Sequence, residues 1–326
     1  MRYAIGGSLA VFGLSLAALG VVPLSAQLDG EGDGSRAGTQ RVDDATTTRT
    51  AEEASVPGWG TPQWRDEFDG NSVDESNWRV RDADTDGNQH YDWAVLDRDA
   101  VCVRDGLLRI RLEELAEPVQ DMGHTRYWST GFLESKGLRE AQYGRWEFRA
   151  KIPTERGSSQ GVWPAFWLTN DSLGEIDIME AWGDPTKRFR PAQFIETSRF
   201  TVHESTEGDR RSEGWWYEPI TMPGADSYMS ADDFHVWTVE YTPDSLKAYM
   251  DGELAVHLVE DEELVSGQEG DYSWLWGETF TSSPWDINVN LQMGDPYWTP
   301  APEPSADTEL PADYLVDYVR FWSFDG

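Results

Sequence analysis

Three carboxylates lie within six residues of one apolar stretch, which reads Gly-Glu-Ile-Asp-Ile-Met-Glu-Ala-Trp-Gly over residues 174–183. A regular strand would point Glu175 and Asp177 to one face and Glu180 to the other, because side chains alternate along a strand. Burial of unpaired carboxylates is costly, so we predict a β-bulge near Ile178 and Met179 that turns Glu180 onto the face of the other two. The interleaved apolar residues argue against the alternative, a solvated acidic strand.

Carboxyl groups that share a face have the chemistry for glycoside hydrolysis, in which one acts as nucleophile and another as proton donor. In enzymes that retain the anomeric configuration, these groups lie roughly 5–5.5 Å apart. Asp177 would lie between the two glutamates, and its charge would raise the pKa of Glu180 so that this carboxyl keeps its proton. The spacing alone does not say which glutamate plays which part.

The elements that must position this strand are themselves β. Apolar residues alternate with charged ones over residues 108–112 and 145–152, which is typical of half-buried strands. Asp251-Gly252 separates two apolar runs and predicts a hairpin. Because no long stretch has a period of 3.6 residues, we predict an all-β fold of two stacked antiparallel sheets, a jelly roll.

A second strand, over residues 285–293, alternates throughout between apolar and polar side chains. Its polar positions are Asp286, Asn288, Asn290 and Gln292. Amides and carboxylates match sugar hydroxyls, so we predict that this face lines a sugar-binding cleft, although an ordinary solvent face would show the same pattern.

Tryptophans accompany the carboxylates. Trp163 and Trp167 share one face of the strand that precedes the carboxylate strand, and Trp182 should share the face of the carboxylates. Flat aromatic surface suits stacking on sugar rings, and we predict this use for all three. Packing within the sheet is the alternative for each of them.

The composition excludes several partners. The chain has 26 Lys plus Arg against 60 Asp plus Glu, a net charge of −34. A nucleic-acid partner would require a basic surface, and an anionic membrane would be repelled. The spread of acidic residues along the chain suggests adaptation to a saline medium, where high charge keeps a protein soluble; an acidic secreted protein without such adaptation is the alternative.

Three segments are expected along the chain. Arg2, an apolar run over residues 3–22 and Ala26 predict a signal peptide over 1–26, with an uncleaved membrane anchor as the alternative. Residues 27–57 are polar and predict a flexible linker, and residues 58–326 form the expected catalytic domain. We therefore expect a secreted protein, extracellular or periplasmic, and a monomer with no membrane contact after processing. The single cysteine, Cys102, is expected to be an inert thiol inside a buried strand.

The carboxylate strand resembles the signature of glycoside hydrolase family 16 in its bulged form. Family-like segments occur in the expected order at residues 64–70, 127–131, 143–147, 163–168, 234–237, 249–252 and 316–320. The resemblance covers about residues 60–324 and implies a concanavalin A-like jelly roll with an open substrate cleft on the concave sheet. It implies endo-hydrolysis of β-linked glucans or galactans with retention. By this resemblance Glu175 is the nucleophile, Asp177 the assisting acid and Glu180 the acid/base.

The same resemblance implies substrate-binding positions. Asn290 matches a position in the cleft of the family, and Gln292 lies in phase with it. His203 is similar to a cleft histidine, although a lone histidine is more often structural. Asn88 and Tyr91 stand where the family has a substrate-binding loop.

The resemblance implies no cofactor for catalysis, but members often carry a structural calcium. Glu67 and Asp317 match two positions of that calcium site. Two carboxylates do not define a site by themselves, because calcium takes six to eight oxygen ligands.

The substrate is left open between three classes. The segments at 161–167 and 174–180 favour a β-1,3- or β-1,3(4)-glucan, as in laminarinases. The short connection at 169–173 and the unmatched stretch after Gly183 favour a galactan, as in agarases, porphyranases or carrageenases. A non-catalytic carbohydrate-binding module is the third alternative, and the intact pair Glu175 and Glu180 argues against it.

Overall fold

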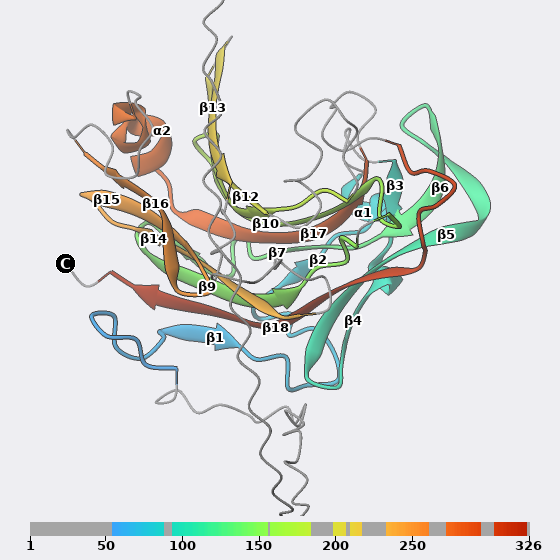
Figure 1. Cartoon of the computed structure of the whole chain (residues 1–326), viewed down its shortest axis with the longest axis horizontal. Coiled ribbons are helices and arrows are strands. Elements are labelled where there is room, and N and C mark those ends of the chain that lie inside the picture. Colours follow the sequence, from blue (N-terminus) through green and yellow to red (C-terminus); the bar gives the residue numbers. More distant parts are fainter. Residues whose placement is uncertain are drawn as a thin grey trace, which may run out of the picture. The chain divides into compact units, whose positions relative to one another are not determined.

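The computed structural model of the chain describes residues 54–87, 93–155, 157–183, 198–206, 209–216, 233–260, 272–294 and 303–324. These residues form two packed β-sheets, so the prediction of a two-sheet β fold is confirmed (Figure 1). Neighbouring strands are antiparallel, apart from the parallel pair β3 and β6. The predicted signal peptide and nearly all of the predicted linker lie outside the described residues.

One sheet has ten strands. In spatial order they are β16 (Glu253–Val259), β15 (Ser245–Met250), β14 (His235–Tyr241), β9 (Gly144–Lys151), β18 (Ala312–Ser323), β5 (Leu107–Asp121), β6 (His124–Thr130) and β3 (Ala94–Leu96), with β1 (Trp64–Asp66) beside β18 and β4 (Val101–Arg104) beside β5.

The other sheet has eight strands and holds all three carboxylates of the 174–183 stretch. Its order is β13 (Asp209–Trp216), β12 (Arg199–Thr206), β11 (Gly174–Glu180), β10 (Val162–Asn170), β17 (Trp285–Met293), β7 (Phe132–Glu134) and β2 (Arg79–Val80), with β8 (Glu140–Ala141) beside β17. Figure 1 shows this sheet curving upward toward β12 and β13.

Helical structure in the described residues is confined to single turns. These are α1 (Ala83–Asp86), α2 (Glu278–Thr281) and the 3₁₀ turns at Arg98–Ala100 and Ser273–Trp276. None of the helices in the described part of the chain is long and apolar enough to cross a membrane.

The core lies between the sheets and follows the predicted alternation. Leu108, Ile110 and Leu112 of β5 are fully buried. Across the sheets, the ring of Phe148 on β9 stacks on that of Phe166 on β10, with centroids 3.8 Å apart. Burial of such aromatic side chains dominates the energetics of a core of this kind, and it fixes β10 against the sheet below.

The sequence also predicted a hairpin at Asp251-Gly252 and a buried position for Cys102. The hairpin at Asp251-Gly252 joins β15 to β16, and both residues have positive φ, 50° and 82°, as a tight type I′ hairpin turn requires. Cys102 was expected in the core, and this was wrong. It lies on β4 but is exposed, because its neighbours Val101 and Val103 take the inward positions.

The packed region begins before the expected boundary at residue 58. Ala54 is buried, and Val56 forms a bridge with Gly60. The indole of Trp59 donates to Glu240 at 2.9 Å, and the indole of Trp322 donates to the carbonyl of Gly60 at 3.0 Å. These contacts tie residues 54–60 to the ten-stranded sheet.

Candidate active site

A β-bulge in β11 places the three carboxylates on one face. The register with β10 pairs Asp177 with Trp167 and Met179 with Phe166, so Ile178 has no partner position. The pairing with β12 shifts at the same place. Ile178 and Met179 are both fully buried in the core, and the strand resumes its alternation with Glu180 on the outer face. The predicted bulge is therefore confirmed at the predicted residues.

Glu180 and Glu175 occupy different environments on that face. Glu180 is 7% exposed, whereas the side chain of Glu175 is 29% exposed. Burial raises the pKa of Glu180 well above its ordinary value, and the negative charges of Asp177 and Glu175 raise it further. Nearby His203 and Arg199 act in the opposite direction. Burial is the largest cause, and it favours the protonated form of Glu180.

His203 lies beside the other two carboxylates, on the neighbouring strand β12. Its Nε2 is 3.0 Å from Asp177 Oδ2 and 3.6 Å from Glu175 Oε1. Its Nδ1 lies 2.5 Å from the hydroxyl of Ser212 on β13. When Ser212 donates to Nδ1, the proton of the imidazole is on Nε2 and points at Asp177. The histidine expected in the cleft is thus brought to the carboxylates.

The three tryptophans of the sequence prediction have different surroundings. Trp163 is partly exposed, and its indole N–H donates to Glu180 Oε1 at 3.2 Å. Trp167 is also partly exposed and donates to Asn290 Oδ1 at 2.7 Å. Both therefore combine an apolar face with a fixed polar edge on the outer face of β10.

Trp182 differs from the prediction, because it is only 1% exposed and does not present its face to solvent. Its ring packs against that of Trp163, with centroids 6.1 Å apart. The next residue explains the close packing. A Cβ at Gly183 would overlap the backbone of Ser159, so the chain after Trp182 presses directly on the segment that leads into β10.

The polar face of β17 points away from the core, as predicted, and it is almost completely buried. Asp286, Asn288, Asn290 and Gln292 are each at most 9% exposed. Thr169 on β10 donates to Asp286, and Asn288 donates to both Thr169 and Asp286, at 3.1–3.2 Å. Burial raises the pKa of Asp286 to about 6. Such low exposure does not fit the alternative of an ordinary solvent face.

The buried polar atoms on the outer face of this sheet include two without a hydrogen-bond partner among the described residues. They are the amide nitrogen of Asn290, which is 1% exposed as a residue, and the hydroxyl of Thr201, which is 3% exposed. Thr201 pairs with Asp177 across β11 and β12. A buried group without a partner is costly, and a ligand hydroxyl at the site could supply the missing bond.

The remaining sequence-based candidates are not brought to the site. Asn88 and Tyr91 lie outside the described residues. Glu67 directly follows β1, and Asp317 lies on β18 of the ten-stranded sheet. Arg320 binds both oxygens of Glu67 at 2.7 Å, and Arg149 binds Asp317 at 2.6 Å.

The two arginines argue against a calcium ion at Glu67 and Asp317. Each predicted ligand is already paired with a cation, and no third carboxylate or histidine within the described ranges gathers with them. The residues do not fit a calcium ion, so the predicted metal site is not supported. The arginine side chains provide the positive charge that these carboxylates need.

Sequence reasoning missed the contribution of β12 and β13 to the site. Arg199 pairs with Glu180 across β11 and β12 and counteracts the rise of its pKa. Ser212 orients His203 from β13. The only available signal was the alternation around His203. The sequence of β13, Asp-Arg-Arg-Ser-Glu-Gly-Trp-Trp, has no apolar period that would reveal a strand.

The chain was compared with known proteins. Its residues 87–286 match the model of "Glycosyl hydrolases family 16". It is 28% identical over 281 residues to glucan endo-1,3-beta-glucosidase A1 of Niallia circulans, a match that covers 79% of this chain and 37% of that protein. It is also 28% identical over 278 residues to a beta-glucanase of Rhodothermus marinus, covering 79% of this chain and 84% of that protein.

Solved structures agree with the fold. The laminarinase catalytic domain of Thermotoga maritima superposes with a TM-score of 0.61 at 25% identity, over 82% of this chain and 99% of that domain. The chain spans little more than a third of the length of the Niallia circulans relative. The family model covers well over half of the chain, on the elements that carry the carboxylates, and the chain belongs to glycosyl hydrolases family 16.

Proposed function

We propose that this chain is an endo-acting, retaining glycoside hydrolase that cleaves β-1,3- or β-1,3(4)-glucans. One observation carries the proposal: a single bulged strand presents two glutamates on one face, one buried with a raised pKa and one more accessible. Paired carboxyl groups whose environments separate their protonation states are suited to acid and nucleophile roles.

In the proposed first step, Glu180 donates its proton to the oxygen of the scissile bond while Glu175 attacks the anomeric carbon. The bond to the leaving sugar breaks, and a covalent glycosyl-enzyme forms with Glu175. Glu180, now ionised, then takes a proton from water, and the resulting hydroxide displaces Glu175. Two inversions give overall retention.

Asp177 and His203 are proposed to position the nucleophile. The Nε2 of His203 lies within reach of both carboxylates, so it holds Asp177 beside Glu175 and offsets part of their combined negative charge. The charge of Asp177 in turn helps to keep the proton on Glu180 until the substrate accepts it. No step needs a metal ion or an organic cofactor, as is general for this family.

The proposed substrate is supported by the chemistry of β10 and β17 and by the relatives. The unpartnered amide of Asn290 and the partly exposed rings of Trp163 and Trp167 suit a neutral sugar chain. Both curated relatives compared above are named as glucanases or glucosidases acting on glucan. Galactan hydrolysis, the alternative, has weaker support, since a keratan-sulfate endo-1,4-beta-galactosidase of Sphingobacterium multivorum is 24% identical to this chain over 273 residues.

Reducing-sugar release from laminarin, lichenan, agarose, porphyran and carrageenan tests the proposal, with Glu175→Gln as the inactive control. Release from laminarin or lichenan by the wild type alone is the expected result. Release only from a galactan would overturn the glucan assignment, and no release from any polymer would favour a binding module. Proton NMR of the first product distinguishes retention from inversion.

We further propose that the protein is secreted and acts as a monomer. The support for secretion is the apolar run at residues 3–22 behind Arg2. N-terminal sequencing of the protein from culture medium and gel filtration test the two statements.

A further inference from the structure

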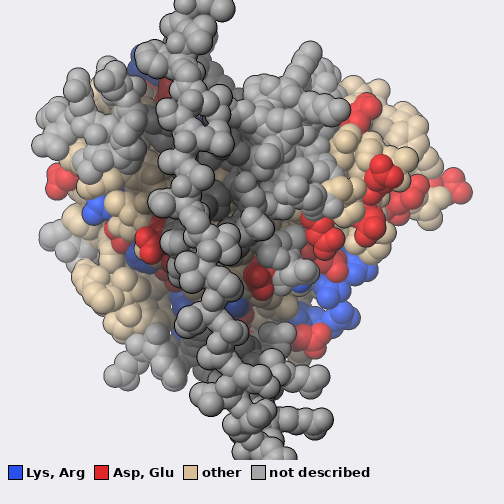
Figure 2. All heavy atoms as spheres, viewed as in Figure 1, with Lys and Arg blue, Asp and Glu red and all other residues tan. Residues whose placement is uncertain are grey.

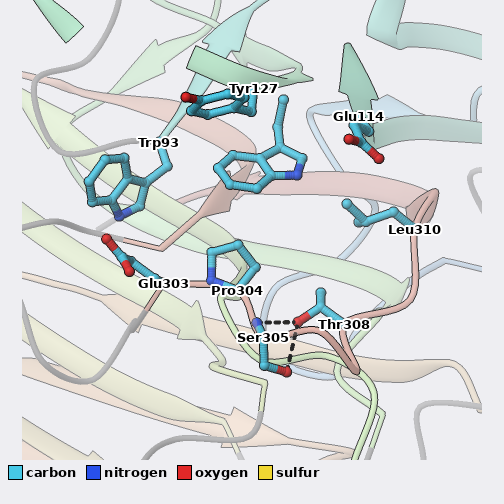
Figure 3. A pocket seen from close by; sticks show the side chains of 9 residues that line it. Trp93, Glu114, Tyr127, Glu303, Pro304, Ser305, Thr308 and Leu310 are labelled. Atoms are coloured by element: carbon cyan, nitrogen blue, oxygen red, sulfur yellow. Dashed lines mark hydrogen bonds between the residues drawn. The ribbon is translucent and has the colours of Figure 1, made fainter. Parts of the chain in front are cut away.

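A pocket of about 450 Å³ lies apart from the carboxylates, between the β5–β6 hairpin and the segment 303–310. Figure 3 shows Tyr127 and Trp93 on one side of it, Glu303, Pro304 and Ser305 on the opposite side, and Glu114 and Leu310 beyond them. The volume falls within the range of roughly 300–1,000 Å³ that is usual for small-molecule sites.

The lining combines aromatic faces with hydrogen-bonding groups. Tyr127 is 47% exposed, and its ring meets that of Trp128 edge to face at 5.7 Å. Trp93 and Trp128 pack against the core on their inner sides, so their positions are fixed. The indole nitrogen of Trp93 is buried and has no hydrogen-bond partner among the described residues. Flat rings and a free donor, together with the acceptor Glu114, are what a sugar ring requires.

The charge of the pocket limits the ligand further. Glu114 and Glu303 contribute carboxylates, and none of the described residues that line the pocket is basic. An anionic ligand would meet like charge with no compensating cation. Carboxylates accept hydrogen bonds from neutral hydroxyls, so the lining suits an uncharged sugar.

The walls of the pocket are hydrogen-bonded to the end of β17 and to the segment just before β10, the two strands that carry the polar face of the active site. The backbone N–H of Trp93 donates to Met293, the residue after Gln292, at 3.1 Å. Gly294 donates to Gly161, two residues before Trp163, at 2.6 Å. The opposite wall is held there too, because the hydroxyl of Thr308 donates to the carbonyl of Gln160 at 2.9 Å.

We propose that this pocket is an auxiliary binding site for an uncharged β-glucan segment that lies away from the scissile bond. The proposal rests on the proposed function, because it takes the ligand to be part of the same polymer. A long chain held at both places gains effective concentration at the carboxylates, whereas an oligosaccharide too short to span both places gains nothing.

Tyr127→Ala tests the proposal, because this side chain is half exposed and its loss should leave folding intact. The matched control is Phe324→Ala, which removes an aromatic ring of 38% exposure that does not line the pocket. Kinetics on laminarin and on a chromogenic trisaccharide compare long with short substrates. Affinity electrophoresis in laminarin gels, with each substitution added to Glu175→Gln, measures binding without turnover.

For Tyr127→Ala we expect the KM on laminarin to rise by about 3- to 10-fold, the effect of losing one aromatic stacking contact. The kcat on laminarin and both constants on the trisaccharide should stay within twofold of the wild type. Retardation in the gel should fall by a similar factor, and Phe324→Ala should change none of these values.

An unchanged KM and unchanged retardation for Tyr127→Ala would overturn the auxiliary site, as would an equal loss on the long and the short substrate. Failure of the proposed function looks different. The wild type would then release no sugar from laminarin, whereas the gel would still report whether Tyr127 contributes to binding.

Discussion

Trp163→Phe is expected to raise the pKa of the acid/base Glu180. The indole N–H donates to the carboxyl of Glu180 at 3.2 Å, and a donor stabilises the charged form. At this length the bond should contribute about 1 kcal/mol. One pKa unit corresponds to about 1.36 kcal/mol, so its loss should raise the pKa by roughly 0.7 unit. Burial already raises that pKa, and the substitution adds to it.

The measurement is the dependence of kcat/KM on pH with laminarin. The alkaline limb, which reports loss of the proton from Glu180 in the free enzyme, should move upward by roughly half a unit to one unit. The acid limb, set by ionisation of Glu175, should stay in place.

Trp167→Phe is the matched control for this shift. The indole of Trp167 also lies on the outer face of β10, but it donates to Asn290 instead of a carboxyl. Its loss should weaken substrate binding and leave the alkaline limb unchanged. A downward shift in Trp163→Phe would refute the reasoning, because it would mean that the ring acts by excluding water. Equal shifts in both variants would point to general loosening of the site.

Three further outcomes are expected. Azide should restore turnover of Glu175→Ala with inversion and of Glu180→Ala, on substrates with a good leaving group, with retention; proton NMR showing the opposite pair would reverse the two roles. Asp286→Asn should gain up to about 3 kcal/mol of stability between pH 4 and pH 7 relative to the wild type. The reason is that the pKa of Asp286, raised to about 6 in the folded protein, favours the protonated side chain. The resulting stabilisation of the wild type is fully present below about pH 4 and is lost as the pH rises through about 6. Urea unfolding at the two pH values, with no difference between the proteins, would contradict this. Chelator should leave the melting temperature unchanged, because Arg320 already satisfies Glu67; a fall of more than about 2 °C would indicate a bound metal.

Alternation of apolar residues predicted the strands well wherever one face packs on the core. It gave β5, β9 and β17 with the correct inward residues. It failed at Cys102, because the apolar run Ala-Val-Cys-Val does not show which of its members face inward. In the structure the two valines on either side fill the core, and the thiol is left exposed.

The geometry of the catalytic strand was predictable because burial of unpaired carboxylates is costly. Three carboxylates among buried apolar neighbours required a bulge, and Ile178 supplies it. Contacts made by strands distant in sequence were not predictable. The hydroxyl of Ser212 reaches His203 from a strand without any apolar period, and the burial of Trp182 depends on Ser159 and the close approach of Gly183. Local patterns contain no information about such partners.

The distribution of charge bears on the choice between neutral and sulfated polymers. Acidic side chains gather on the β5–β6 hairpin, at the right of Figure 2, where Glu113, Glu114 and Glu117 are exposed. On the eight-stranded sheet, Glu175 and Asp177 share the outer face with Glu180 and Asp286.

A sulfate about 6 Å from one ionised carboxylate would be repelled by roughly 3 kcal/mol at an effective dielectric constant of about 20, which is a factor of more than 100 in binding. Of the basic groups at this face in the described ranges, His203 and Arg199 are already directed at carboxylates. Neither is placed to bind an added anion without giving up that interaction. Porphyran and carrageenan carry sulfate and laminarin does not, so the electrostatics of the described residues favour an uncharged polymer such as laminarin over these sulfated galactans.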